Sequence, residues 1–199
     1  MPQQDVLPVV RCRLRFSFGD SPLNQLFFDI ETSGLDSGVD VVSCVGFYSP
    51  KVGLHQFVGS LAVKDADEFL KKFDRAAWQL VGFNSEFFDL PFLRAHGAEH
   101  FDVFGHVDLM PPASANLRAV DWRACVASGG NAAQQIRVHK DSACLALNIY
   151  VPKHSSGQAV ALMGKRGSDD DVKEICEHNA IDLFATYELW REMKKWRWV

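Results

Sequence analysis

Apolar residues recur along the chain with two periods, and each period predicts a different class of element. Residues 10–18 alternate strictly between apolar and polar side chains, which is typical of a half-buried strand with Arg11, Arg13 and Arg15 on its outer face. Short apolar runs that end at turn residues predict further, buried strands. These strands are expected at residues 26–30, 41–48, 52–58, 80–83 and 101–109, with 41–48 and 52–58 paired as a hairpin.

Helical spacing of apolar residues appears between and after these strands. Two helix starts carry recognisable caps: Asp65 and Glu68 have the spacing of a capping box, and Ser85 can cap a helix that Gly97 ends. Helices are therefore expected at residues 65–77, 85–96, 115–127, 142–149 and from Ser168 onward, with Gly- and Ser-rich turns up to about residue 167.

The order of these elements predicts a mixed α/β sheet. Three strands come in succession, a helix, a strand, a helix and a strand follow, and helices close the chain. At 199 residues the chain is long enough to bury its own core, and no internal repeat or linker divides it. We therefore expect a single domain over residues 1–199, with residues 1–24 as an N-terminal extension that carries the first strand.

Composition and charge indicate an ordinary globular protein. The chain has no run of about 18 apolar residues that could span a membrane, and its N-terminus lacks the pattern of a signal peptide, so we expect a cytoplasmic protein. The five cysteines form no Cys-x-x-Cys pair and are expected to be reduced core thiols.

The formal net charge of −4 argues against binding a polyanion through a global field. Two bound divalent ions would add 2 × (+2) and bring the total to about zero, so nucleic acid is not excluded.

Acidic residues follow two predicted strands and recur on the final helix. Asp29 and Glu31 are two apart on one strand, so their side chains project from the same face. Asp89 falls in the first turns of a predicted helix that follows another strand, and His178 and Asp182 are four apart on one helix face. A carboxylate beside an apolar strand is costly to bury without a nearby cation. The three segments therefore predict one shared site for a hard divalent ion such as Mg²⁺.

These motifs, taken in their order, resemble those of the DEDD 3′–5′ exonucleases, the DnaQ-like branch of the ribonuclease-H-like superfamily. The resemblance covers about residues 26–190 and implies a five-stranded mixed sheet of order 3-2-1-4-5 flanked by helices. Its motifs are Phe-Asp-Ile-Glu-Thr-Ser-Gly-Leu at 28–35, Gly-Phe-Asn-Ser-Glu-Phe-Phe-Asp at 82–89 and His-Asn-Ala-Ile-Asp at 178–182.

The resemblance also implies an activity and a set of functional residues. The activity is hydrolysis of single-stranded nucleic acid from its 3′ end to mononucleotides, with two Mg²⁺ or Mn²⁺ ions and with a separate polymerase or repair factor as a partner. We expect DNA in preference to RNA, although no residue can be shown to read a 2′-hydroxyl. The implied metal ligands are Asp29, Glu31, Asp89 and Asp182, and the implied substrate-binding residues are Thr32, Leu35, Asn84 and Phe88.

The third motif has two variants in the family, with His five positions before the Asp or Tyr four positions before it. This chain fits neither, because position 177 is Glu177. The sub-branch with Tyr-Asn-x-x-Asp matches best because Asn179 agrees, but His178 stands where the tyrosine is expected. An imidazole, with an ordinary pKa of about 6.5, accepts a proton at neutral pH more readily than a phenol with a pKa of about 10. Our hypothesis is that His178 orients or deprotonates the attacking water.

Other polar groups have simpler interpretations. Asp108 ends an apolar strand and is interpreted as a strand-end residue or an indirect support of the site. A zinc site at His96, His100 and His106 is disfavoured because Gly97 breaks the helix that would align the first two. Three basic segments can contact nucleic acid or simply be solvated or packed on the domain. They are the arginines at 11–15, the turn at 164–167 and the C-terminal residues 194–198.

Two other functions stay open at the level of the sequence. One is a non-catalytic ribonuclease-H-like module that binds nucleic acid or organises an assembly, and loss of a carboxylate would favour it. The other is a structure-selective endonuclease on the same fold. All four carboxylates are present, which favours the exonuclease.

Overall fold

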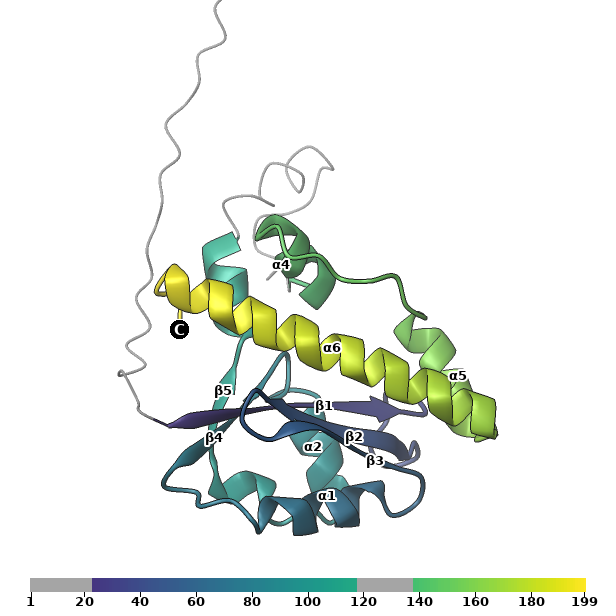
Figure 1. The fold of residues 1–199 in the computed structure, drawn as a ribbon. Coiled ribbons are helices and arrows are strands. Elements are labelled where there is room, and N and C mark those ends of the chain that lie inside the picture. The colour runs from purple at the N-terminus through teal and green to yellow at the C-terminus, as the bar shows by residue number, and fades with distance from the viewer. Residues whose placement is uncertain (1–22, 118–137) are drawn as a thin grey trace, which may run out of the picture.

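A five-stranded sheet forms the centre of the computed structural model, which describes residues 23–117 and 138–199 (Figure 1). The strands are β1 (Asn24–Thr32), β2 (Val42–Ser49), β3 (Gly53–Val58), β4 (Trp78–Gly82) and β5 (Gly105–Asp108). They lie in the order β3-β2-β1-β4-β5. The β1–β2 and β2–β3 pairs are antiparallel, whereas β1–β4 and β4–β5 are parallel. The predicted fold class and strand order are confirmed.

Helices cover both faces of the sheet and give the described part three layers (Figure 1). They are α1 (Ala62–Leu70), α2 (Asp89–Ala95), the 3-10 helix η1 (Phe101–Val103), α4 (Lys140–Ala146), α5 (Gly157–Arg166) and α6 (Asp169–Lys195), and residues 110–117 are also helical. In Figure 1, α1 and α2 lie on one face, and α6 crosses the other face with α4 and α5 beside it. The central strands are therefore shielded from solvent on both sides.

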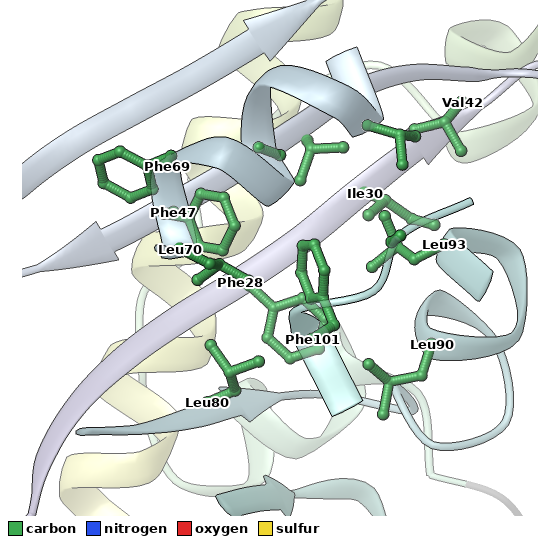
Figure 2. Packing of buried hydrophobic residues seen from close by; sticks show 14 of the residues in the cluster. Phe28, Ile30, Val42, Phe47, Phe69, Leu70, Leu80, Leu90, Leu93 and Phe101 are labelled. Carbon is green, nitrogen blue, oxygen red and sulfur yellow. The ribbon is translucent and has the colours of Figure 1, made fainter. Parts of the chain in front are cut away.

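β1 divides its side chains between the two helical layers, because successive residues of a strand point to opposite faces. Phe28 and its even-numbered neighbours join the apolar cluster beside α1 and α2 (Figure 2). Phe27 belongs to the cluster on the other face, where its ring centroid lies 5.3 Å from that of Tyr187 on α6. The same alternation directs Asp29 and Glu31 toward α6. The alternation of side chains along β1 thus determines that these two carboxylates face α6.

α6 starts at Ser168, as predicted, and packs closely on β2. The capping box is complete: Ser168 Oγ accepts a hydrogen bond from the N–H of Asp171, and the Asp171 carboxylate accepts one from the N–H of Ser168. At Gly46 of β2, an added Cβ would lie 1.9 Å from Asn179 Oδ1 and 2.7 Å from Cδ1 of Leu183. The bare backbone at this position lets the helix approach the sheet.

Two predicted helix starts are wrong. α1 begins at Ala62, ahead of the predicted capping box, and Asp67 within that box accepts a hydrogen bond from the backbone N–H of His100 at 2.7 Å. α2 begins four residues after Ser85, whose hydroxyl lies 2.8 Å from Nε2 of His106. Local spacing predicted a cap in both places. At Ser85, a residue distant in sequence binds the side chain instead.

Residues 157–166, predicted as turns, form helix α5. Gly164 favoured the turn interpretation, but it lies where α5 meets the sheet, and a Cβ there would be 3.2 Å from Ser43 Oγ. The absence of a side chain at Gly164 lets α5 pack closely on β2. Gly167, in contrast, ends the helix with a φ of 67°. The strand expected at 101–109 is shorter than predicted, because η1 takes its first residues and leaves only β5.

Some predictions fall outside the described residues. They are the strand at 10–18 with its arginines, nearly all of the extension at 1–24, and most of the helix at 115–127. Within the described ranges, the thiols of Cys44, Cys144 and Cys176 are free. Among the helices of those ranges, none combines the length and the apolar character that crossing a membrane requires.

Candidate metal centre

Acidic residues from three elements meet around the end of β1. Asp29 and Glu31 lie on β1, and Asp182 lies near the middle of α6. One carboxylate oxygen from each of these three lies within 4.8 Å of the others. Asp89, the first residue of α2, adjoins them, since its Oδ1 accepts a hydrogen bond from the N–H of Ile30 at 3.2 Å. All four predicted ligands are therefore in one region of the fold, and three are within reach of one ion.

These carboxylates are nearly closed off from water. Asp29, Glu31 and Asp89 are only 8%, 7% and 5% exposed. Burial raises the pKa of all three, and the charge of a neighbouring carboxylate raises each pKa further. Oε1 of Glu31 has no hydrogen-bond partner within the described structure. An unpaired buried acceptor is costly, so this oxygen-rich donor set fits a hard divalent cation.

Lys140, the first residue of α4, lies between two of the carboxylates. Its Nζ is 3.1 Å from Asp29 Oδ1 and 2.7 Å from Asp182 Oδ2. Burial alone would lower the pKa of Lys140, but the two carboxylates more than compensate and raise it, so the ammonium stays charged. Burial likewise opposes ionisation of Asp182, and the charge and hydrogen bond of Lys140 nevertheless hold the pKa of Asp182 below its ordinary value. The sequence analysis missed this lysine.

Two histidines, His154 and His178, stand beside Asp182. His178 Nε2 lies 3.9 Å from Glu31 Oε1 and 3.8 Å from Asp182 Oδ2. Burial is the main cause that lowers the pKa of His178, so its imidazole is neutral at neutral pH. His154, which the sequence analysis also missed, lies 3.7 Å from Asp182 Oδ1 through its Nε2. The two imidazole rings are in edge contact, with centroids 4.6 Å apart.

Asn179 holds Asp29 in place from α6. Its Nδ2 donates to the Asp29 backbone carbonyl at 3.1 Å and to Asp29 Oδ2 at 3.2 Å. Its Oδ1 accepts a hydrogen bond from Gln56 Nε2 at 3.0 Å. Since Asn179 is fully buried, these bonds fix the orientation of the Asp29 carboxylate and tie α6 to β1 and β3.

The four predicted substrate-binding residues have different environments. Leu35 is 86% exposed in the loop after β1, and Thr32 is buried at the end of that strand. Asn84 has a positive φ of 61°, and its buried Oδ1 has no hydrogen-bond partner in the described ranges. The ring of Phe88 packs on Phe92 and the apolar core, with centroids 5.0 Å apart.

Asp108 shapes the loop that carries Asn84. Its Oδ1 accepts hydrogen bonds from the N–H groups of Asn84 and Met110, at 2.8 and 2.9 Å, and its Oδ2 accepts one from Glu86 at 3.0 Å. A carboxylate with three backbone donors has a clear role in holding the loop, which agrees with the strand-end interpretation.

The three histidines considered for zinc each have a separate partner. His96 Nδ1 is 2.9 Å from the Phe92 carbonyl, and His100 Nδ1 is 2.6 Å from Asp67. His106 pairs with Ser85, as described above. In the described ranges, each of these three histidines therefore has a partner of its own.

A cleft of about 890 Å³ opens next to Asp182 and His178. Its walls are the start of α4 and the segment between α4 and α5, which includes Lys153 and the 86% exposed Tyr150. A ligand can therefore approach the carboxylates from this side, past an aromatic ring and a lysine.

Solved structures with a similar fold come from proteins that are larger than this chain or distant in sequence. The family B DNA polymerase from the archaeon Pyrobaculum calidifontis superposes with a TM-score of 0.58 at 16% identity, over 87% of this chain and 25% of the polymerase. E. coli exonuclease I in complex with a dT13 oligonucleotide gives 0.46 at 15% identity, over 86% and 41%. The Aedes aegypti Nibbler EXO domain gives 0.47 at 13% identity, over 87% and 80%.

The chain thus spans about a quarter of the polymerase and about two fifths of the E. coli enzyme. At this identity, the polymerase likeness shows a common fold. No curated protein sequence matches the chain. A family model described as RNase_H superfamily matches residues 26–194, which is most of the chain. The match and the fold agree, and the chain belongs to the RNase_H superfamily.

Proposed function

We propose that the protein is a metal-dependent 3′–5′ exonuclease that hydrolyses single-stranded nucleic acid, DNA in preference to RNA, to mononucleotides. The observation that supports the proposal best is the meeting of Asp29, Glu31 and Asp182 oxygens within 4.8 Å. Asp182 is 151 positions from Glu31 and 153 from Asp29 along the chain (182 − 31 and 182 − 29). Lys140 contacts Asp29 and Asp182, but Glu31 Oε1 has no hydrogen-bond partner in the described ranges, so the buried cluster still favours a bound cation. Membership of the RNase_H superfamily agrees with a nuclease.

The carboxylates would hold Mg²⁺ or Mn²⁺, and the resemblance to the DEDD exonucleases implies two ions. Asp29, Glu31 and Asp182 are the proposed ligands, and Asp89 completes the set. Such ions, when bound, make water a better nucleophile at neutral pH and offset charge on the phosphate. The protein's own contribution is orientation: Asn179 fixes Asp29, and the N–H of Ile30 fixes Asp89.

His178 is proposed to act on the attacking water. Its imidazole is neutral because burial lowers its pKa, and its Nε2 is directed toward Glu31 and Asp182. A neutral nitrogen can accept a proton from water that lies between these groups. The pH–rate profile of His178→Ala tests this role, and an undiminished rate would exclude it.

The substrate is proposed to enter through the cleft beside Asp182. Lys153 and Tyr150 supply a cation and a stacking surface there, the two features that single-strand binders combine. Thr32, Leu35 and Asn84 are the proposed contacts of the terminal nucleotide, and Phe88 supports them from the core. The 3′–5′ polarity comes from the family resemblance. The proposed partner is the 3′ end of a single strand, delivered by a separate polymerase or repair factor.

One labelled-strand assay tests the activity, its polarity and its metal requirement together. A 5′-labelled single strand is incubated with the protein in Mg²⁺ or in EDTA. We expect progressive shortening in Mg²⁺ alone. A single internal cut would identify an endonuclease, and an intact but shifted strand would identify a binding module.

Two matched variants test the ligand assignment in the same assay. Asp29→Ala removes a proposed ligand, and the expected rate loss exceeds the roughly 100-fold that loss of an outer-shell partner causes. Asp170→Ala makes the same change at an exposed site in the first turn of α6 and should leave the rate unchanged. Equal rates for the two variants would contradict the assignment.

A further inference from the structure

We propose that His154, His178 and Asp182 form a second metal site, which takes an imidazole-preferring dication of the Zn²⁺ class. The site lies between α6 and the segment that joins α4 to α5. It shares only Asp182 with the three clustered carboxylates. One ligand atom from each of its three residues lies within 4.8 Å of the others.

The spacing of these atoms is wrong for hydrogen bonds and right for ligands of one ion. His154 Nε2 lies 3.7 Å from Asp182 Oδ1, and His178 Nε2 lies 3.8 Å from Asp182 Oδ2. Hydrogen bonds of this kind are usually shorter than about 3.2 Å. Two ligands with bonds of about 2.0–2.2 Å to one ion lie roughly 3 to 4 Å apart.

The hydrogen bond on the other side of the His154 ring supports a ligand role. Nδ1 lies 2.9 Å from the backbone carbonyl of Pro152. A carbonyl can only accept, so Nδ1 carries a proton and Nε2 is the ring nitrogen that can bind an ion. Nε2 faces Asp182 Oδ1 at 3.7 Å, a separation that suits two ligands of one cation. Metal-bound histidines commonly donate their other N–H to a backbone carbonyl in this way.

His178 and its neighbour Glu31 also lack the contacts that buried polar groups normally have. Both side chains are more than nine-tenths buried, at 6% and 7% exposure. Nevertheless, His178 Nδ1 and Glu31 Oε1 have no hydrogen-bond partner in the described part of the chain. Glu31 Oε1 lies 3.9 Å from His178 Nε2 and faces the proposed site, where it can approach the same ion.

Lys140 leaves one oxygen of Asp182 available. Its ammonium contacts Asp29 and Asp182 Oδ2, the oxygen nearer His178, whereas Asp182 Oδ1 faces His154 and can bind the ion. Two imidazoles and one carboxylate favour Zn²⁺ or Co²⁺ over Mg²⁺, which prefers oxygen ligands. When this site is occupied, His178 Nε2 binds the ion and cannot accept a proton from water, so the two roles exclude each other at any one moment. Zn²⁺ binding tests the first role, and the pH–rate profile of His178→Ala in Mg²⁺ tests the second.

Metal binding without nucleic acid tests the proposal independently of nuclease activity. The full chain is stripped with EDTA and titrated with Zn²⁺ by calorimetry and with Co²⁺ by visible absorption. We expect a tight Zn²⁺ site and a Co²⁺ ligand-field band that excess Mg²⁺ does not remove. His154→Ala should weaken Zn²⁺ binding by about 100-fold or more and abolish the band.

Three further variants make the result decisive. His96→Ala removes a histidine at the C-terminal end of α2, outside the cleft that His154 and His178 line, and should leave the titration unchanged. His154→Gln keeps a polar side chain, and both His154 variants are compared with wild type by thermal unfolding in EDTA to establish that they fold. Asp29→Ala should retain the Zn²⁺ site even though it abolishes hydrolysis. Equal Zn²⁺ affinity in wild type and folded His154→Ala, or displacement of Zn²⁺ by Mg²⁺, would overturn the proposal.

Discussion

The positive charge of Lys140 should stabilise the metal-free protein and oppose metal binding. Lys140 is only 13% exposed at its side chain and bridges Asp29 and Asp182. Lys140→Met keeps the length of the side chain and removes its charge. The carboxylates then remain buried together without their ammonium partner.

The magnitude follows from the two distances. At an effective dielectric constant of about 20, contacts of 2.7 and 3.1 Å correspond to roughly 6 and 5 kcal/mol of attraction. Dehydration of the ammonium opposes several kcal/mol of this, so removal of one partner costs about 3–5 kcal/mol. For a domain of this size, that loss lowers the midpoint of thermal unfolding by roughly 6–20 °C.

Thermal unfolding in EDTA and in MnCl₂ measures both effects. In EDTA, Lys140→Met should unfold at a lower temperature than wild type. Mn²⁺ should raise the midpoint of the variant by more than it raises that of wild type, because the ion no longer competes with the ammonium. Lys173→Met, at an exposed position on α6, is the matched control. If Lys140→Met and wild type have the same midpoint in EDTA and the same Mn²⁺ response, the reasoning is wrong.

Two further predictions concern the packing and the capping of α6. Gly46→Ala should lower the free energy of unfolding by about 2 kcal/mol or more in urea, because the new Cβ would meet Asn179 Oδ1 at 1.9 Å. Gly105→Ala, with no atom nearer than 3.8 Å, is the control, and equal losses would contradict the close approach. The hydrogen bond from Arg166 is the main cause that lowers the pKa of Asp171 from 3.8 to about 2. Because the folded-state pKa is the lower one, the ionised Asp171 stabilises the folded protein above pH 4, and this contribution is lost as the pH falls toward 2. The stability gap between wild type and Asp171→Asn in urea should therefore close over that pH range, and a constant gap would exclude the ion pair as its source.

Much of the fold could be predicted because local patterns and global packing agree. The apolar run around Phe28 predicts a buried strand, and that strand is β1 at the centre of the sheet. Ser168 and Asp171 predict the start of α6 through a cap that is formed within one turn. The two-residue spacing of Asp29 and Glu31 likewise predicts their common face. In each case the deciding interaction lies within a few residues.

The parts that could not be predicted depend on contacts across long stretches of chain. Lys140 meets Asp29 across 111 residues, and nothing in its own surroundings distinguishes it from a solvated lysine. His154 lies in a segment without helical or strand periodicity and reaches Asp182 only in the folded protein. Gly164 favoured a turn in the sequence because the contact that requires a small residue there, with Ser43 on β2, is visible only in the folded protein. Tertiary packing overrode the local pattern at all three.

The close packing of Asn179 on Gly46 limits where residues can be inserted into or deleted from the chain. An α-helix turns about 100° per residue, so one residue inserted between Ser168 and Asn179 would swing the following side chains away from β1. Leu183 would leave the core in the same step, because it lies on the same stretch of helix. Insertions and deletions in this family member should therefore be confined to the connections around α6, and a shift of register within the helix would abolish the core and the carboxylate cluster together.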